Sequence, residues 1–215
     1  MKTLGPAEVV IFDHDGTLVD SIPVVVKATN EVLLSLGLPP ATPDTIVAGM
    51  IHATGHRLGL LAGVGEAEGQ RPLVRAYVRA ALAHANQAGL YPGIEAMLRI
   101  LACRGRTMAV VSNSEGAFIR SILTRLGVAS AFRALIGEDD MVAPKPDPRG
   151  LLAALNGTAR SRAVYVGDSS TDLATARAAG VRAIGVTWGT HTRKELEALN
   201  FDALVDTPLE LARLL

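Results

Sequence analysis

From about residue 91 to the end of the sequence, short apolar runs alternate with helical patterns. Alternation of this kind predicts parallel strands with helices packed over them. The runs at 109–111 and 163–166 are apolar without interruption, as is typical of strands buried on both faces. One more strand is predicted near the start of the chain, at 8–12. We therefore expect an α/β protein built on a parallel sheet.

A long helical stretch separates the first predicted strand from the others. Helical signals dominate from Ser21 to Ala88, where Pro23 suits the first turn of a helix and Gly37 suits a helix end. The predicted division is an α/β core formed by residues 1–18 and 91–215, interrupted by an α-helical domain formed by residues 19–90.

The individual elements follow from the same patterns. Strands are predicted at 107–111, 132–136, 163–166, 182–186 and 203–205, and helices at 94–104, 116–126, 148–155, 171–179, 193–199 and 208–214. Within the helical stretch, helices are predicted at 24–36, from 42–44 onward, and at 66–88.

Composition limits the partners and the compartment. Lys+Arg and Asp+Glu both total 21, so the chain is formally neutral and has no broad positive field to hold a nucleic acid. No apolar run approaches the ~20 residues that span a bilayer, and no signal peptide is visible, so we expect a cytoplasmic protein without a membrane partner. The single cysteine, Cys103, lies in an apolar stretch and is expected to be buried.

Polar side chains follow several predicted strands at their carboxyl ends, where open parallel sheets bind ligands. They are Asp13 and Asp15 after the first strand, Ser112 and Asn113 after the strand at 107–111, Lys145 in the proline-rich loop after the strand at 132–136, and Asp168 and Asp172 after the strand at 163–166. We expect these side chains to meet at one edge of the sheet.

Carboxylates crowded at one edge repel each other, so either some stay protonated or a cation balances them. All-oxygen ligation suits Mg²⁺. Asp13 and Asp15 flank a single residue, so one carboxylate can face a substrate phosphorus while the other handles protons. Lys145 supplies a fixed positive charge, and Ser112 and the amides of 14–16 can donate hydrogen bonds to phosphoryl oxygens.

These residues resemble the four motifs of the haloacid dehalogenase superfamily of phosphatases. The segment 13–21 is similar to the first motif, Ser112-Asn113 to the second, Lys145 to the third and 167–172 to the fourth, in the same order along nearly the whole chain. The resemblance implies a Rossmann-like core with an α-helical cap domain inserted after the first motif. Within the superfamily, the first motif and the segment 185–189 look most like those of phosphoglycolate phosphatases.

The resemblance also implies roles for the residues. Asp13 would be the nucleophile and a metal ligand, and Asp15 the general acid and base with its backbone carbonyl on the metal. The remaining roles are phosphate binding by Thr17, Ser112, Asn113 and Lys145, and Mg²⁺ binding by Asp168 directly and by Asp172 mainly through water. The implied activity is Mg²⁺-dependent hydrolysis of a small phosphorylated metabolite, phosphoglycolate-like or a phosphosugar, through an aspartyl-phosphate.

Other functions stay open at this point. Asp15 disfavours dehalogenase chemistry, which needs no second aspartate, and phosphonate cleavage, whose enzymes lack an acid at that position. A phosphosugar mutase of the β-phosphoglucomutase type and a non-catalytic binding protein remain alternatives, and both a monomer and a homodimer fit the sequence.

Two histidines and an arginine in the helical stretch give a weaker signal. The segment 51–57 is either a solvated helix start or a surface that faces the core, in which case Arg57 can pair with a substrate carboxylate. His14, between the two aspartates of the first motif, is expected to contribute its backbone amide while its imidazole faces the cap or solvent.

Overall fold

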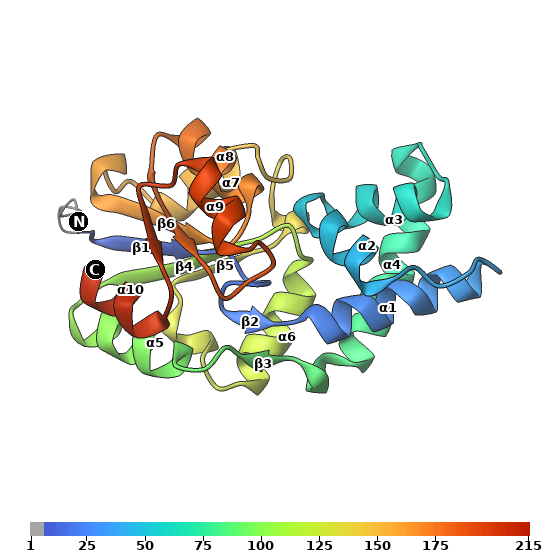
Figure 1. Cartoon of the computed structure of the whole chain (residues 1–215), viewed down its shortest axis with the longest axis horizontal. Coiled ribbons are helices and arrows are strands. Elements are labelled where there is room, and N and C mark those ends of the chain that lie inside the picture. Colours follow the sequence, from blue (N-terminus) through green and yellow to red (C-terminus); the bar gives the residue numbers. More distant parts are fainter. Residues whose placement is uncertain (1–6) are drawn as a thin grey trace.

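The computed structural model describes residues 7–215, so residues 1–6 of the predicted core lie outside the described part. Within that part, six parallel strands form one sheet in the order β5-β4-β1-β6-β7-β8 (Figure 1). The strands are β1 (Val9–Phe12), β4 (Thr107–Val111), β5 (Ala134–Ile136), β6 (Ala163–Gly167), β7 (Arg182–Val186) and β8 (Ala203–Val205). The predicted α/β class with a parallel sheet is therefore confirmed.

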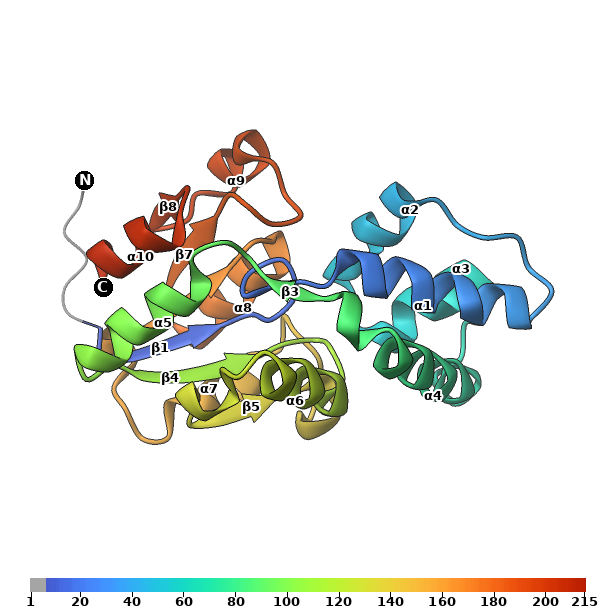
Figure 2. The same ribbon diagram turned by 90° about the horizontal axis from the view of Figure 1, so that it is seen from below.

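Helices cover both faces of the sheet, because successive strand residues point to opposite sides. Val10 and Phe12 pack with α5 (Ile94–Cys103), α6 (Gly116–Arg125) and α10 (Pro208–Leu214). Val9 and Ile11 pack with α7 (Arg149–Leu155) and α8 (Ser170–Ala179), and α9 (Arg193–Leu199) lies against α8. Figure 1 shows the inner strand β1 between these layers, and Figure 2 shows the sheet from the side of α5 and α6; this position explains why all four residues of β1 are apolar and buried.

Four helices lie together beyond one end of the sheet, and we call them, with their connecting turns, the helical unit (residues 22–87). They are α1 (Ile22–Ser35), α2 (Pro43–Ala48), α3 (Thr54–Ala62) and α4 (Ala67–Ala83), with single 3-10 turns at η1 (Gly49–Ile51) and η2 (Ala85–Gln87). Pro23 stands in the first turn of α1, as expected, and Gly37 follows the helix with a left-handed φ of +74°. The longest helices, α1 and α4, pack against each other.

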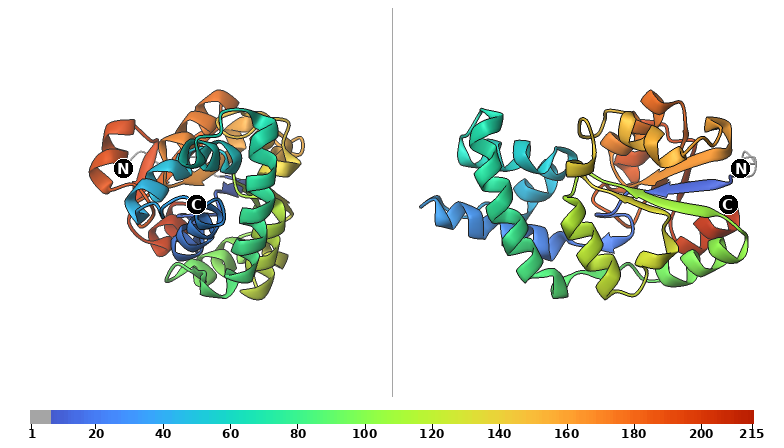
Figure 3. Two further views of the ribbon diagram at one scale, coloured as in Figure 1. Left: turned by 90° about the vertical axis from the view of Figure 1, so that its right-hand side faces the viewer. Right: turned by 180° about the vertical axis from the view of Figure 1, so that it is seen from behind.

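A short two-stranded ribbon joins the helical unit to the sheet. It consists of β2 (Val19–Asp20) and β3 (Gly89–Leu90), which pair antiparallel, so the chain leaves and re-enters the core at one place. Figure 3 shows the helical unit extending from this ribbon beside the sheet. Helix α4 also contacts α6, and apolar side chains of α1, α3 and α4 continue the cluster that covers one face of the sheet.

Some local predictions differ from the structure. Cys103 is exposed, because the inward face of α5 is occupied by Leu98 and Leu101 and the last helical position turns outward. The helix predicted at 66–88 ends at Ala83, and a 3-10 turn continues the path. Among the described residues, no helix combines the length and apolarity that crossing a membrane requires.

Candidate active site

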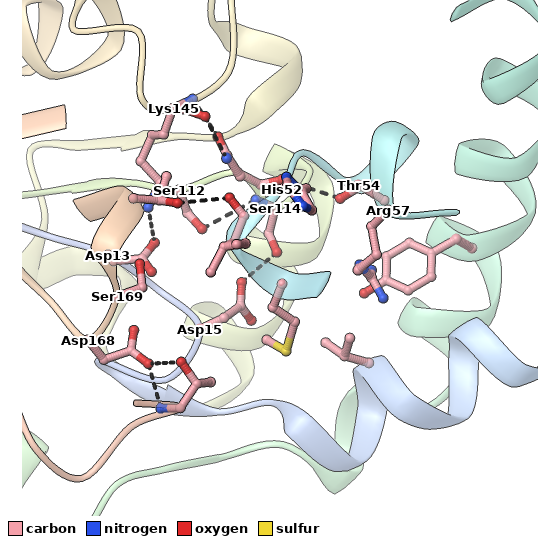
Figure 4. A pocket seen from close by; sticks show the side chains of 17 residues that line it. Asp13, Asp15, His52, Thr54, Arg57, Ser112, Ser114, Lys145, Asp168 and Ser169 are labelled. Carbon is pink, nitrogen blue, oxygen red and sulfur yellow. Dashed lines mark hydrogen bonds and ion pairs between the residues drawn. The ribbon is translucent and has the colours of Figure 1, made fainter. Parts of the chain in front are cut away.

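The carboxyl ends of β1, β4 and β6 meet at one edge of the sheet, and predicted site residues lie there (Figure 4). Asp13 directly follows β1, and its amide donates to the carbonyl oxygen of Val166 in β6 at 2.8 Å. Ser112 directly follows β4, and Asp168 directly follows β6. All three polar side chains are buried. Their meeting therefore follows from the register of three neighbouring parallel strands.

The loop after β1 brings its backbone against the Asp168 carboxylate. Gly16 adopts a φ of +77°, which favours glycine, and a Cβ at this position would overlap that carboxylate. A Cβ at Gly189 would also overlap the Asp168 side chain. Thr190 then donates both its amide and its hydroxyl to Asp168 Oδ2, each at 2.6 Å. Asp168 is thus held in one orientation by backbone on two sides.

Lys145 is the buried cation of this edge. Its ammonium lies 2.9 Å from Asp13 Oδ1 and 2.7 Å from Asp172 Oδ1, and it donates to the Tyr165 hydroxyl at 3.0 Å. The Asn113 side chain holds the lysine's backbone, accepting from its amide at 2.7 Å and donating to its carbonyl at 3.2 Å. Burial would lower the pKa of Lys145, but the two carboxylates raise it well above its ordinary value. The ammonium therefore keeps its charge.

Three buried carboxylates outnumber this single ammonium. Oxygens of Asp13, Asp168 and Asp172 all lie within 4.8 Å of one another. Burial and the neighbouring carboxylates raise the pKa of Asp13 to about 7 even with Lys145 beside it, and burial and Asp172 raise the pKa of Asp168 to about 6. Such values mark an excess of negative charge. The all-oxygen donor set and this excess both fit a divalent cation of the Mg²⁺ type.

Asp15 differs from the other acids because hydrogen-bond donors surround it. Its Oδ1 receives the Ser21 hydroxyl and lies 3.1 Å from His14 Nδ1, and its Oδ2 receives the Ser114 hydroxyl at 2.5 Å. Burial would raise the pKa of Asp15, but His14, Ser114 and Ser21 hold it well below its usual range. The expectation that the His14 imidazole faces the cap or solvent is wrong: the ring is fully buried, edge-on to Phe118.

The residues expected to hold a phosphate divide into two groups. Ser112 and Asn113 line the same cavity as Asp13. Thr17 is buried outside the cavity lining, and its hydroxyl donates to Asp168 Oδ1 at 3.3 Å. The Asn113 side chain is hydrogen-bonded to the backbone of Lys145, and Thr17 supports the Asp168 carboxylate from outside the cavity lining.

Arg57 enters the same cavity from the helical unit, opposite the carboxylates (Figure 4). Its side chain is only 4% exposed, donates to Thr29 Oγ1 at 2.7 Å and lies over the Tyr77 ring, 5.0 Å from the centroid. Among residues 7–215, no carboxylate forms an ion pair with this guanidinium. Glu138 is close enough to interact electrostatically with Arg57 but forms no ion pair with it. A buried cation hydrogen-bonded to a neutral hydroxyl, stacked on an aromatic face and without a carboxylate in ion-pair contact is suited to an anionic ligand. The reading of 51–57 as a solvated helix start is therefore wrong for Arg57.

The helical unit touches the sheet edge directly at the cavity. Thr54 donates its amide to Glu138 Oε2 at 2.9 Å and its hydroxyl to the Asn113 carbonyl at 3.3 Å. Thr171, in the first turn of α8, donates to the carbonyl of Ile51 at 2.9 Å. The cavity is therefore bounded by both parts of the molecule.

Sequence reasoning missed several residues of this site. Ser114 could have been found, since it directly follows the Ser112-Asn113 pair. Tyr165 reads as an ordinary strand residue, and Thr190 lies on a distant loop, so only the folded chain brings them to Lys145 and Asp168.

Comparison with known proteins gives the family. The family model described as haloacid dehalogenase-like hydrolase matches residues 10–186. The chain therefore belongs to the haloacid dehalogenase-like hydrolase family, which confirms the predicted resemblance and the prediction of an enzyme.

Relatives and a solved structure agree with this assignment. A plasmid-encoded phosphoglycolate phosphatase of Cupriavidus necator is 36% identical over 98% of this chain and 94% of its own length. A phosphoglycolate phosphatase of Rhodospirillum rubrum is 35% identical over 92% of this chain and 86% of its own. A crystal structure described as a haloacid dehalogenase-like hydrolase, from Bacteroides fragilis, superposes with a TM-score of 0.89 at 30% identity and covers 97% of this chain and 100% of that one.

Proposed function

We propose that this protein is a Mg²⁺-dependent phosphatase that hydrolyses a small phosphate monoester whose leaving group carries a carboxylate, such as phosphoglycolate. The observation that carries the proposal is one cavity with Asp13, Lys145 and Asp168 on its sheet side and the unpaired cation Arg57 on its helical side. The relatives named phosphoglycolate phosphatase, at 35% and 36% identity, support the same substrate class.

In the first step, a carboxylate oxygen of Asp13 attacks the phosphorus, and the bond from phosphorus to the leaving oxygen breaks. Lys145, 2.9 Å from Asp13 Oδ1, offsets negative charge on the transferring phosphoryl group. Ser112 and the backbone amides of 14–16 donate hydrogen bonds to its oxygens. The product of this step is an aspartyl-phosphate on Asp13 and the free alcohol.

Asp15 moves the protons of both steps. Its Oδ2, at the cavity, is charged in the substrate-free protein; in this mechanism it takes a proton from solvent once a negatively charged phosphate lies beside it, and gives that proton to the leaving oxygen as the bond breaks. The resulting carboxylate then takes a proton from a water that attacks the aspartyl-phosphate, which releases inorganic phosphate and restores Asp13. Three donors around Asp15 stabilise the charged form that the second step needs.

Asp13, Asp168 and, mainly through water, Asp172 would hold Mg²⁺, with the Asp15 carbonyl as a further ligand. When bound, the cation offsets the charge of the buried carboxylates and of the phosphoryl oxygens. In its presence Asp13 would lose its proton more readily than its raised pKa of about 7 allows, so that the carboxylate is ready to attack at neutral pH.

The helical unit supplies the substrate selection in this proposal. We assign residues 1–18 and 91–215 to a catalytic core and 19–90 to a cap domain, joined by the β2–β3 ribbon. Arg57 would form a charge-assisted pair with the carboxylate of the leaving group while the phosphate lies at Asp13. Thr29 and Tyr77 hold the guanidinium in the orientation that this pairing needs.

The test is an assay of small phosphate esters with and without Mg²⁺, in which the release of inorganic phosphate is measured. 2-Phosphoglycolate and ethyl phosphate form a matched pair, since both have a two-carbon leaving group and only the first carries a carboxylate. We expect 2-phosphoglycolate to be preferred and the Asp13→Asn variant to be inactive on both. Phosphoryl transfer to a sugar without phosphate release would identify a mutase, and inactivity on every ester with Mg²⁺ present would overturn the proposal.

A further inference from the structure

We propose that the His14 imidazole is a positioning residue for the acid/base carboxylate of Asp15, a role that rests on the phosphatase mechanism proposed above. The sequence places this histidine between the proposed nucleophile Asp13 and the proposed acid/base Asp15, where its backbone amide is among those proposed to donate to the phosphoryl oxygens. Its side chain turns away from the cavity and reaches back to the carboxylate of the next residue, with Nδ1 at 3.1 Å from Asp15 Oδ1.

The two carboxylate oxygens of Asp15 have different hydrogen-bond partners. Oδ1 contacts His14 and also receives the hydroxyl of Ser21, at the start of α1. Oδ2 contacts Ser114 alone among the described residues, and both Asp15 and Ser114 line the cavity. Oδ1 is therefore the anchored oxygen, and Oδ2 is the one that can exchange a proton with a leaving group.

The surroundings of His14 fix the direction of its ring. The side chain is completely buried, and its edge meets the Phe118 ring at a centroid distance of 5.9 Å and an interplanar angle of 73°. Within residues 7–215, Nε2 has no hydrogen-bond partner, so Asp15 is the polar group that this imidazole serves. A leucine at position 14 would satisfy the apolar contact equally well, which indicates that the imidazole is present for its Nδ1.

Loss of this contact leaves the Asp15 carboxylate free to rotate about its χ angles, so that Oδ2 spends less time where the leaving oxygen departs. The effect falls on the proton donation of the first step. It is large for an alkoxide, which must be protonated as it leaves, and small for a leaving group that departs as a stable anion. Binding of the phosphate and attack by Asp13 do not use the His14 side chain.

The experiment compares His14→Leu and His14→Asn with the wild-type enzyme on ethyl phosphate and acetyl phosphate, with Mg²⁺. Both compounds have a two-carbon leaving group, but acetyl phosphate is a mixed anhydride whose acetate leaves without a proton. The measured quantity is kcat/KM, which reports the steps up to departure of the leaving group, with an Asp13→Asn sample as the background for spontaneous hydrolysis. Asparagine keeps an N–H donor near the place of Nδ1, whereas leucine keeps only the volume.

We expect His14→Leu to lower kcat/KM for ethyl phosphate by about tenfold or more and for acetyl phosphate by less than about threefold. His14→Asn should recover most of the loss on ethyl phosphate, with the thermal midpoint of both variants close to that of the wild type. An equal loss of kcat/KM on ethyl phosphate and acetyl phosphate, or no loss on either, would overturn the positioning role. Wild-type enzyme that hydrolyses neither of these compounds nor 2-phosphoglycolate would instead overturn the phosphatase proposal, so the two failures are distinguishable.

Discussion

The sheet edge buries an excess of negative charge, whereas the helical unit buries a positive charge that forms no ion pair among the described residues. The sheet edge gathers the carboxylates of Asp13, Asp168 and Asp172 around the single ammonium of Lys145, an excess of negative charge. The helical unit buries the guanidinium of Arg57 with a hydroxyl and a ring as its neighbours. One side of the cavity is suited to a cation and the other to an anion. A substrate with a phosphate at one end and a carboxylate at the other, together with a divalent cation, would balance both.

The largest expected effect comes from the sheet edge. Asp13→Asn removes the nucleophile and should lower kcat by about 10³-fold or more. The fold should persist, because the change also removes one of the mutually repelling buried carboxylates, whose pKa is raised to about 7. The checks are steady-state phosphate release and the thermal midpoint without added metal. Comparable turnover in the variant and the wild type would break the assignment of Asp13.

Removal of Mg²⁺ should have the second largest effect on activity. We expect EDTA to lower activity by about 100-fold or more and Mg²⁺ to restore it, because the three carboxylates need a counter-charge. A second readout does not depend on turnover: Mg²⁺ should raise the thermal midpoint of the wild type by several degrees, since it binds the folded state. Asp168→Asn should abolish most of this rise. Full activity in chelator, or a rise that survives in the variant, would count against the metal site.

In the helical unit, substitutions of Arg57 test whether its charge binds the substrate carboxylate. Arg57→Met keeps the packing on Tyr77 but removes the charge, so KM for 2-phosphoglycolate should increase by about 10–100-fold, the range for a lost hydrogen-bonded charge pair. KM for ethyl phosphate should change by less than about threefold. Arg57→Lys is the control that keeps the charge without the planar guanidinium. Its KM for 2-phosphoglycolate should lie between those of the wild type and of Arg57→Met. Equal changes in KM for both esters would mean that Arg57 does not read the carboxylate.

The smallest effect concerns acids outside the cavity, where the two parts face each other. Glu115 lies at a hollow together with Arg75 and Arg79 of α4. Burial, followed by the carboxylates of Glu138, Asp139 and Asp140, raises the pKa of Glu115 to about 7. The folded state therefore binds more protons than the unfolded state between about pH 4.5 and 7, and stability falls as the pH rises through that window.

Glu115→Gln removes this titration while keeping the shape of the side chain. The thermal midpoint of the wild type should fall by one or two degrees more than that of the variant between about pH 5 and 8, measured at constant Mg²⁺. The other titrating carboxylates are the same in both proteins, so the difference isolates Glu115. An equal change in the thermal midpoints of wild type and variant across this pH range would contradict the raised pKa of Glu115.

The same two regions also differ in how far the sequence predicts them. Asp13, Ser112 and Asp168 come directly after strands, and parallel register brings strand ends to one edge, so their meeting was predictable. Arg57 was found only as one of two readings, because its burial depends on how α1, α3 and α4 pack. Local pattern misplaced the His14 ring as well, since its apolar neighbour Phe118 lies more than a hundred residues away along the chain.

The contacts of individual side chains at the sheet edge could not be predicted from the spacing of the motifs. Thr17 donates to Asp168 and the Asn113 side chain is hydrogen-bonded to the backbone of Lys145, contacts that the predicted phosphate-binding roles of these two residues did not include. Tyr165 and Thr190 complete the surroundings of Lys145 and Asp168 from elements that gave no sequence signal. Spacing thus predicted which groups gather, and packing decides which of them face the cavity.

As the proposed nucleophile, Asp13 carries the phosphoryl group between the two steps, and this covalent intermediate can be trapped. In an Asp15→Asn variant, acetyl phosphate should still phosphorylate Asp13, because acetate needs no proton, while hydrolysis of the aspartyl-phosphate should be slow without its base. Acid quenching, proteolysis and mass spectrometry should then find one phosphoryl group per chain on the peptide that contains Asp13. A phosphoryl group on another residue, or steady release of phosphate with the Asp13 peptide always unmodified, would contradict the mechanism.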